Sequence, residues 1–64
     1  MRYLIEADNP DGTYSTVARF DCPGELEQRL RACADLDGRI GAPRRLSVWC
    51  KETATCLAVW KPYA

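Results

Sequence analysis

The sequence has 64 residues, which is enough for one small domain. A folded chain of this length buries only about 60% of the surface that its unfolded form exposes, which leaves little interior for both a core and a deep catalytic cleft. Nine basic and nine acidic residues balance each other, and histidine is absent. The positive charge of a non-specific nucleic-acid binder and the commonest acid–base catalyst are therefore both missing. We expect a single domain over residues 1–64 that is not an enzyme.

The four cysteines, at positions 22, 33, 50 and 56, follow no metal-binding pattern. Five residues fill the shortest gap between them, whereas structural zinc sites usually place ligands two to four residues apart. We expect no metal and no cofactor. The N-terminus reaches Glu6 and Asp8 without a signal-like apolar stretch, and no run approaches the length of a membrane span. We therefore expect a cytoplasmic protein of a bacterial host with reduced thiols, no membrane attachment and no small-molecule substrate.

Two strands joined by a tight turn are predicted at the N-terminus, over residues 2–7 and 14–20. In the turn between them, Pro10 suits the first central position of a type I turn, Asp11 suits the second, and Gly12 can adopt the positive φ that follows.

The alternation of side chains does not decide which face of these two strands points toward the core. Either Tyr3, Ile5 and Ala7 or the intervening residues could point inward, and we favour Tyr3 and Ile5, placed beside Ala18 and Phe20. The residues then expected on the outer face are Arg2, Leu4, Glu6, Ser15, Val17 and Arg19.

A helix is predicted from residue 23 to about residue 37. Pro23 suits the first helical turn, and Gly38 suits the left-handed position after the last one. The inward face is expected to carry Cys22, Leu26, Leu30 and Cys33. Cys22 lies at the start of the helix, where a thiol can be reactive, but its place in the apolar stripe favours burial over reactivity.

A second hairpin is predicted from residues 44–51 and 55–61 around a three-residue loop, Glu52-Thr53-Ala54. This loop places three pairs on the core face: Leu46 opposite Trp60, Val48 opposite Ala58, and Cys50 opposite Cys56. The other face then shows an apolar patch of Leu4, Val17, Trp49, Leu57 and Val59, unless loops cover it. The predicted fold is a two-layer α+β arrangement, a four-stranded antiparallel sheet with one helix in the order ββαββ.

Charge is segregated along the chain, with eight acids and four bases in residues 1–37 and one acid and five bases in residues 38–64. An acidic edge can imitate a phosphate backbone, and an arginine pair can grip carboxylates or phosphates. The alternative is ordinary solvated turn charge. The candidate partner-binding residues are Glu6, Asp8, Asp11, Arg44, Arg45 and the exposed aromatic Trp49.

Three features carry a family resemblance: the opening Met1-Arg2-Tyr3-Leu4-Ile5-Glu6-Ala7, the Asp8 to Gly12 turn, and the helix begun at Cys22-Pro23-Gly24-Glu25. Together with the small size and segregated charge, this outline resembles the anti-CRISPR proteins of phages and mobile elements that are directed at type I complexes. These inhibitors share no common motif, so no functional residue is carried over. The resemblance implies a stoichiometric inhibitor that binds a subunit of a type I CRISPR–Cas surveillance complex or its nuclease and blocks target-DNA binding or cleavage.

Two other functions remain open from the residues. A small nucleic-acid-binding module would stack bases on Trp49 and track phosphates with Arg44 and Arg45, although the balanced net charge disfavours direct nucleic-acid binding. A partner protein of the toxin–antitoxin or immunity type would bury Trp49, Leu57 and Val59 against its cognate protein.

Overall fold

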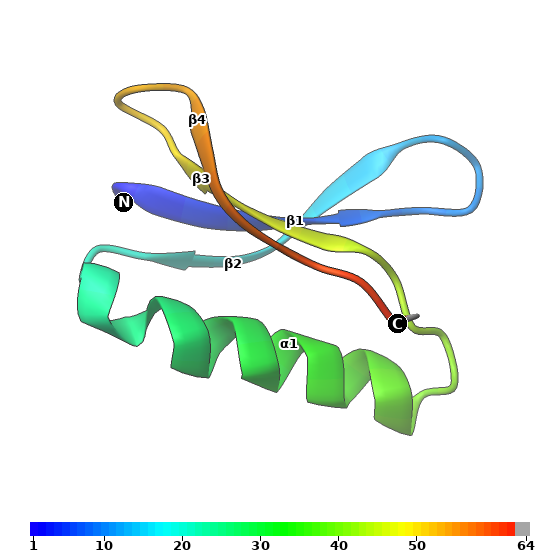
Figure 1. The fold of residues 1–64 in the computed structure, drawn as a ribbon. Coiled ribbons are helices and arrows are strands. Elements are labelled where there is room, and N and C mark those ends of the chain that lie inside the picture. Colours follow the sequence, from blue (N-terminus) through cyan, green and yellow to red (C-terminus); the bar gives the residue numbers. More distant parts are fainter. Residues whose placement is uncertain (63–64) are drawn as a thin grey trace.

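The computed structural model describes residues 1–62, and they form two layers (Figure 1). The elements in chain order are β1 (Tyr3–Asp8), β2 (Tyr14–Phe20), the short 3-10 helix η1 (Pro23–Glu25), α1 (Leu26–Arg39), β3 (Leu46–Cys50) and β4 (Thr55–Trp60). The strands form one antiparallel sheet in the order β2-β1-β3-β4, and α1 lies across one face of it. The predicted α+β fold and its element order are confirmed.

The turn of the first hairpin forms as its residues predict. The N–H of Gly12 donates to the carbonyl of Asn9 at 3.1 Å, and Gly12 has a φ of 88°, which an L side chain adopts only with strain. The register is also the favoured one, with Tyr3 opposite Phe20 and Ile5 opposite Ala18.

Two residues of β2 lie on the other face from the one predicted. The ladder shifts between Ile5 and Glu6, so Val17 is an extra, bulged residue and Ser15 lies opposite Ala7. Val17 packs against the core instead of facing outward. The prediction was wrong here because a bulge changes the side-chain alternation beyond it, and no residue type marks the bulge in advance.

The core lies between α1 and the sheet, mainly under the two central strands. It consists of five buried side chains, Ile5, Ala7, Phe20, Leu46 and Val48. Leu26, Leu30 and Cys33 of α1 pack against this cluster as predicted, with Ala34 beside them. Each large aliphatic side chain buried here contributes about 1.5–3 kcal/mol, so these few residues supply much of the stability of so small a domain.

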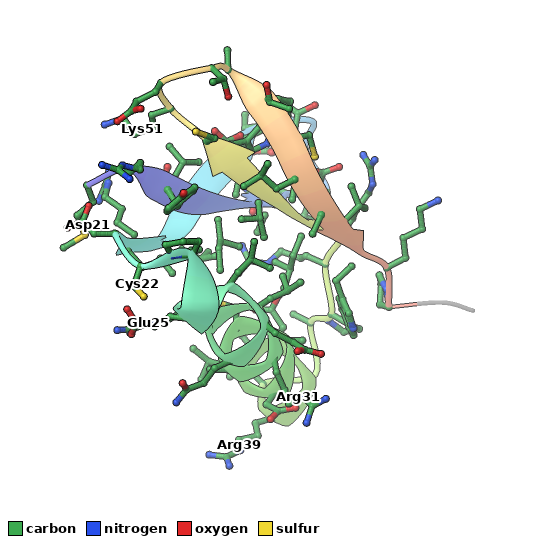
Figure 2. All side chains as sticks on the ribbon, turned by 60° about the vertical axis from the view of Figure 1, so that its left-hand side comes forward. Asp21, Cys22, Glu25, Arg31, Arg39 and Lys51 are labelled. Carbon is green, nitrogen blue, oxygen red and sulfur yellow. The ribbon has the colours of Figure 1, made fainter. Side chains whose placement is uncertain are left out.

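Both ends of the helix differ from the prediction. Cys22 precedes η1 in an extended conformation and is exposed, so it lies outside the apolar stripe (Figure 2). At the other end, α1 continues through Gly38 to Arg39, and the left-handed residue that follows the cap is Gly41, whose φ is 72°. There the N–H of Ala42 donates to the carbonyl of Asp37 at 3.0 Å, and that of Gly41 to the carbonyl of Gly38 at 3.2 Å. This Schellman ending satisfies carbonyls that the last helical turn leaves open.

The second hairpin confirms two of its three predicted pairs. Leu46 lies opposite Trp60 and Val48 opposite Ala58, but the ladder then shifts at a bulge and Cys56 lies opposite Trp49. Cys50 pairs with Thr55 across a four-residue loop, so the predicted Cys50–Cys56 pair does not form and all four cysteines are free. Because Cys50 shares the helix-side face with Tyr3 while Cys56 shares the opposite face with Trp49, the two thiols project from different faces of the sheet.

Candidate functional site

Among the described residues, no helix or strand lies over the sheet face opposite α1, which we call the open face (Figure 1). The strand register arranges its side chains in rows across the sheet. Leu4 and Trp49, both half-buried, lie side by side in the first row between Arg19 and Cys56. An aromatic and an aliphatic side chain thus form the apolar centre of this face.

The second row is centred on Glu6, which lies between Thr16 and Ser47, and it ends at Val59. Glu6 is half-buried, and within residues 1–62 no ion pair joins it to a basic side chain. Val59 is 42% exposed, and Leu57 in the neighbouring bulge is 46% exposed. Three of the five residues expected in the apolar patch, Leu4, Trp49 and Val59, thus lie on the open face by register, whereas Val17 packs inward.

The third row is charged and lies at the end of the sheet. Asp8 and Arg45 are adjacent: the Asp8 N–H donates to the Arg45 carbonyl at 3.0 Å, and the side chains form an ion pair at 3.6 Å. The second carboxylate oxygen of Asp8, Oδ1, is buried without a hydrogen-bond partner in the described residues. Asp8 is therefore committed to Arg45, and it is a weaker candidate for a direct partner contact than the sequence predicts.

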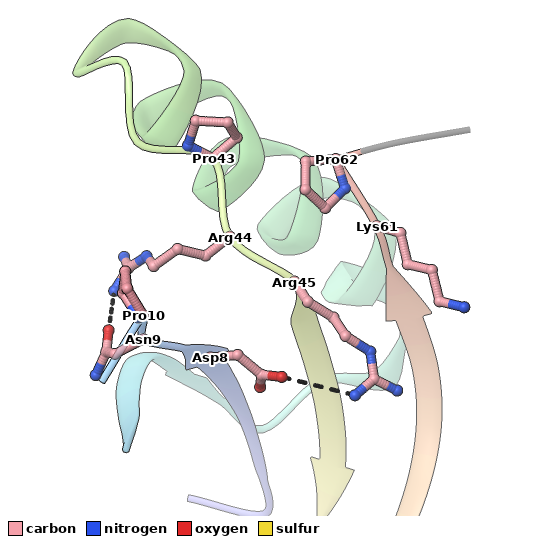
Figure 3. A pocket seen from close by; sticks show the side chains of 8 residues that line it. All are labelled: Asp8, Asn9, Pro10, Pro43, Arg44, Arg45, Lys61 and Pro62. Carbon is pink, nitrogen blue, oxygen red and sulfur yellow. Dashed lines mark hydrogen bonds and ion pairs between the residues drawn. The ribbon is translucent and has the colours of Figure 1, made fainter. Parts of the chain in front are cut away.

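A pocket of about 360 Å³ continues this row beyond the sheet (Figure 3). Three segments that are far apart in the chain meet there: the first hairpin loop, the connection from α1 to β3, and the residues after β4. Its lining consists of Asp8, Asn9, Pro10, Pro43, Arg44, Arg45, Lys61 and Pro62.

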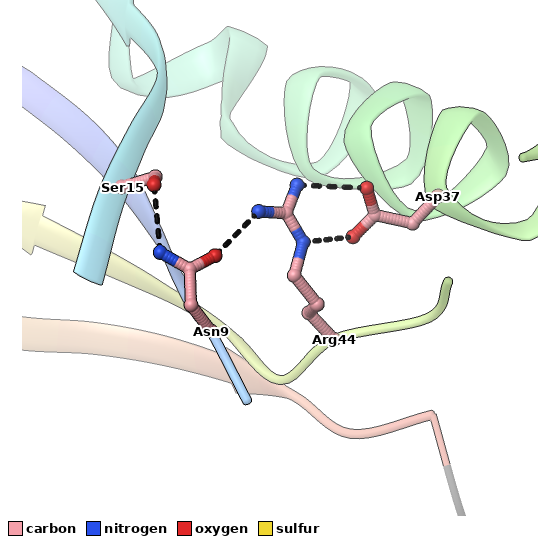
Figure 4. Close-up of polar contacts among 4 residues, drawn as sticks. All are labelled: Asn9, Ser15, Asp37 and Arg44. Atoms are coloured by element: carbon pink, nitrogen blue, oxygen red, sulfur yellow. Dashed lines mark hydrogen bonds and ion pairs between the residues drawn. The ribbon is translucent and has the colours of Figure 1, made fainter. Parts of the chain in front are cut away.

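Arg44 is held inside the molecule. Its Nε and Nη2 donate to the two carboxylate oxygens of Asp37 at 3.2 and 2.9 Å, and its Nη1 donates to Oδ1 of Asn9 at 2.9 Å (Figure 4). Asn9 in turn donates to the Ser15 hydroxyl at 2.8 Å. The bonds with Asp37 raise the pKa of Arg44 above its ordinary value. This network, which we call the Arg44 clamp, ties the end of α1 to the first hairpin.

The importance of Asp37 is missing from the sequence-based prediction. Asp37 is only 3% exposed, although a carboxylate at the end of a helix is ordinarily solvated. A signal was present: Asp37 continues the spacing of Leu26, Leu30 and Cys33, so it falls on the inward face. An acid on an apolar stripe indicates a buried ion pair, and the partner is an arginine seven residues away.

Asp11 lies at the tip of the first hairpin, where it is exposed. It accepts hydrogen bonds from the N–H of Thr13 at 3.0 Å and from the Thr13 hydroxyl at 2.6 Å. These bonds favour the ionised form and lower the pKa of Asp11. Asp11 thus stabilises its own turn and also leaves a negative charge at the tip.

The charge segregation seen along the chain is partly cancelled in space. Three ion pairs join the acid-rich half to the base-rich half: Asp8–Arg45 at 3.6 Å, Asp37–Arg44 at 2.9 Å and Arg2–Glu52 at 3.2 Å. Two of them, Asp8–Arg45 and Arg2–Glu52, lie at the two ends of the neighbouring strands β1 and β3, and Asp37–Arg44 joins the end of α1 to the loop that follows it. Of the six candidate partner-binding residues, Glu6 and Trp49 lie on the open face, and neither takes part in an ion pair within residues 1–62.

Residues 1–62 were also considered for a metal centre and for a membrane-spanning helix. No cluster of three potential metal-ligating side chains is found there, and no helix in that range is long and apolar enough to cross a membrane. Comparison with protein-family models, with curated proteins and with solved structures gives no match.

Proposed function

We propose that this protein is a stoichiometric, non-enzymatic inhibitor that covers a surface of a partner protein with its open face. The partner we propose is a subunit of a type I CRISPR–Cas surveillance complex, or the nuclease it recruits, in the cytoplasm of a bacterial host. Binding would block target-DNA binding or cleavage by occupying the surface concerned. The observation that carries the proposal is the placement of Trp49, Leu4 and Glu6 together on an uncovered sheet face.

The apolar centre supports a protein partner. Trp49 is half-buried next to Leu4, with Val59 exposed one row away. Tryptophan is among the residues most enriched at the energetic centres of protein interfaces, because it buries a large area while its shape stays rigid. The mixture of half-buried apolar residues with a polar surround matches the layout of such interfaces.

The charge of this face supports a basic partner. Glu6 lies next to the apolar centre without an ion-pair partner in residues 1–62, and Asp11 adds a negative charge at the hairpin tip. Surfaces that bind nucleic acid carry lysine and arginine. A guide-RNA complex or a DNA nuclease therefore offers the basic residues that Glu6 and Asp11 would attract.

The contacts of Arg44 and Arg45 disfavour the nucleic-acid-binding alternative. Arg44 is bonded to Asp37 and Asn9, and Arg45 is paired with Asp8, so neither is free to track a phosphate backbone. An immunity-type partner would use the same open face as the proposed inhibitor, and the experiment below separates the two.

The test is binding of the purified protein to purified type I surveillance complexes and their nuclease, followed by a target-DNA binding and cleavage assay. We expect a saturable complex of fixed stoichiometry and loss of DNA binding or cleavage. Trp49→Ala should weaken binding by about 30-fold or more, as expected for an interface hot spot. Leu36→Ala, which removes an exposed apolar side chain from α1, is the matched control and should leave binding unchanged.

The charge of the face is tested separately. Glu6→Arg should slow association with the complex, and high salt should reduce the difference from the parent. Glu27→Arg makes the same change on the exposed surface of α1 and should have little effect. Failure of the parent protein to bind any type I component overturns the CRISPR assignment. Binding that withstands Trp49→Ala and Glu6→Arg overturns the assignment of the open face.

A further inference from the structure

Three prolines line the pocket at the end of the sheet (Figure 3). Pro10, Pro43 and Pro62 each come from a different segment of the chain. A proline ring is apolar and fixes its own φ. These three residues therefore lose little conformational entropy when a ligand binds. The pocket volume of about 360 Å³ is at the lower end of the range for ligand sites, which suits one or two side chains.

The charges in the pocket leave one positive charge unbalanced. All three guanidinium nitrogens of Arg44 already donate hydrogen bonds in the Arg44 clamp, and Asp37 balances its charge. Arg45 is balanced by Asp8, at a rather long 3.6 Å. Lys61 is exposed, and within residues 1–62 it forms no ion pair. A ligand that carries one negative charge on an apolar body therefore complements this pocket.

We propose that the pocket binds a short peptide segment of the protein partner in which a large apolar side chain stands next to an aspartate or glutamate. The apolar side chain contacts the three prolines, and the carboxylate pairs with Lys61, the lining cation that forms no ion pair within residues 1–62. This inference rests on the proposed function, because the pocket extends the third row of the open face and a partner covering that face reaches it.

A peptide fits this pocket better than a nucleic-acid backbone does. The proline rings offer no donor to a phosphate, and Arg44 and Arg45 are already paired with Asp37 and Asp8. The single remaining positive charge of Lys61 is little for a chain that carries one negative charge per nucleotide. A single carboxylate beside an apolar group meets the one unbalanced charge and the apolar walls together.

In the test, blocked dipeptides are titrated into the isotope-labelled protein, and binding is monitored by nuclear magnetic resonance. Acetyl-Phe-Glu-amide should give saturable shifts at the amides of Asn9, Arg45 and Lys61, with a dissociation constant on the order of 1 mM for so small a ligand. Acetyl-Phe-Gln-amide and acetyl-Ala-Glu-amide should each bind about three- to ten-fold more weakly, because one lacks the charge and the other the apolar group.

The matched variants are Lys61→Ala and Lys51→Ala, both changes of an exposed lysine at the end of a strand. Lys61→Ala should weaken binding of the Glu peptide and leave binding of the Gln peptide unchanged, whereas Lys51→Ala should affect neither. A dispersed spectrum for each variant verifies folding.

The proposal is overturned by an absence of saturable shifts around the pocket, by equal binding of the Glu and Gln peptides, or by tighter binding of a short thymidine oligonucleotide at the same amides. These outcomes are independent of the type I binding assay. If the peptide binds but no type I component does, the pocket proposal stands and the proposed function is overturned. If the protein inhibits a type I complex but binds no peptide, the proposed function stands and the pocket proposal is overturned.

Discussion

The two hairpins share one plan but are held in different ways. Each pairs a central strand with an edge strand, and each edge strand carries one bulged residue, Val17 in β2 and Leu57 in β4. Both hairpins pack on α1, the first through β2 and the second through β3. In the first hairpin, Asp11 and Thr13 also close the loop, and the Arg44 clamp ties it to the end of the helix. The second hairpin leaves Leu57 and Val59 exposed. The first hairpin is thus fixed by polar contacts as well as by the core, and the second contributes exposed apolar surface.

The two bulges also protect the edges of the sheet. They lie on opposite sides of the same central rung, Ala18–Ile5–Val48–Ala58. A bulge interrupts the row of free N–H and C=O groups through which edge strands pair with other chains. The exposed Val59 of β4 is therefore more suited to side-chain contacts on the open face than to strand addition.

The largest expected effect comes from breaking the Arg44 clamp. Arg44→Ala leaves the Asp37 carboxylate buried and unpaired, which should lower the free energy of unfolding by about 3–5 kcal/mol. Arg45→Ala removes a half-exposed partner of Asp8 and should cost less than about 1 kcal/mol. Urea denaturation of both variants measures the difference. Equal losses would contradict the structural role given to Arg44.

The two loops should respond in opposite directions to exchange of alanine and glycine. Gly12→Ala places a side chain at a φ of 88° and should destabilise the protein by about 1–2 kcal/mol. Ala54→Gly relieves the positive φ of 52° in the second loop and should stabilise it by up to about 1 kcal/mol. In a domain of this size, 1 kcal/mol corresponds to roughly 4–8 °C in the melting temperature, which differential scanning calorimetry resolves.

Thiol alkylation compares the second hairpin with the helix. Hydrogen bonds from the hydroxyl and N–H of Thr53 lower the pKa of Cys50, whereas burial against the core raises the pKa of Cys33. Because the thiolate is the reactive form, iodoacetamide should modify Cys50 faster than Cys33 at neutral pH, by about ten-fold or more. Mass spectrometry of timed digests measures both rates. Faster modification of Cys33 would show that the helix opens more readily than the hairpin loop.

The smallest expected effect is the pH dependence of the first turn. The pKa of Asp11 in the folded protein lies below its ordinary value of 3.8, so its contribution to stability is present above that value and is lost as the pH falls through the folded-state pKa. Asp11→Asn should therefore lower the melting temperature slightly near pH 6 and make no difference near pH 2. A difference that grows as the solution is acidified would contradict the Asp11–Thr13 bonds.

Local signals correctly predicted much of the architecture. Pro10, Asp11 and Gly12 specify a turn geometry among themselves, and the turn forms as predicted. Ile5 lies opposite Ala18 as predicted, but the bulge at Val17 sets this pair, because the register next to the turn would place Ile5 opposite Val17. In the second hairpin, Leu46 pairs with Trp60 and Val48 with Ala58 as predicted from a three-residue loop. The loop has four residues, and the bulge at Leu57 offsets the extra residue. The prediction failed for Cys56, because the bulge at Leu57 depends on how β4 bends along its neighbour and not on the residues of the loop.

The candidate site was predictable only in part. Trp49 and Glu6 lie on the open face as expected, because period-two alternation assigns faces within a strand. The role of Arg44 was not predictable, since an arginine in a loop has the same sequence signature whether a partner or Asp37 binds it.

The sequence by itself determined the order of the elements, the first turn and the inward faces of the helix and central strands, since each depends on residues a few positions apart. Tertiary structure alone decided that β1 and β3 are neighbours, that Arg44 reaches Asn9 of the first hairpin, and that three prolines line one pocket. The physical reason is that these contacts join segments far apart in the chain. They form only when burial of Ile5 and Val48 brings the two halves together.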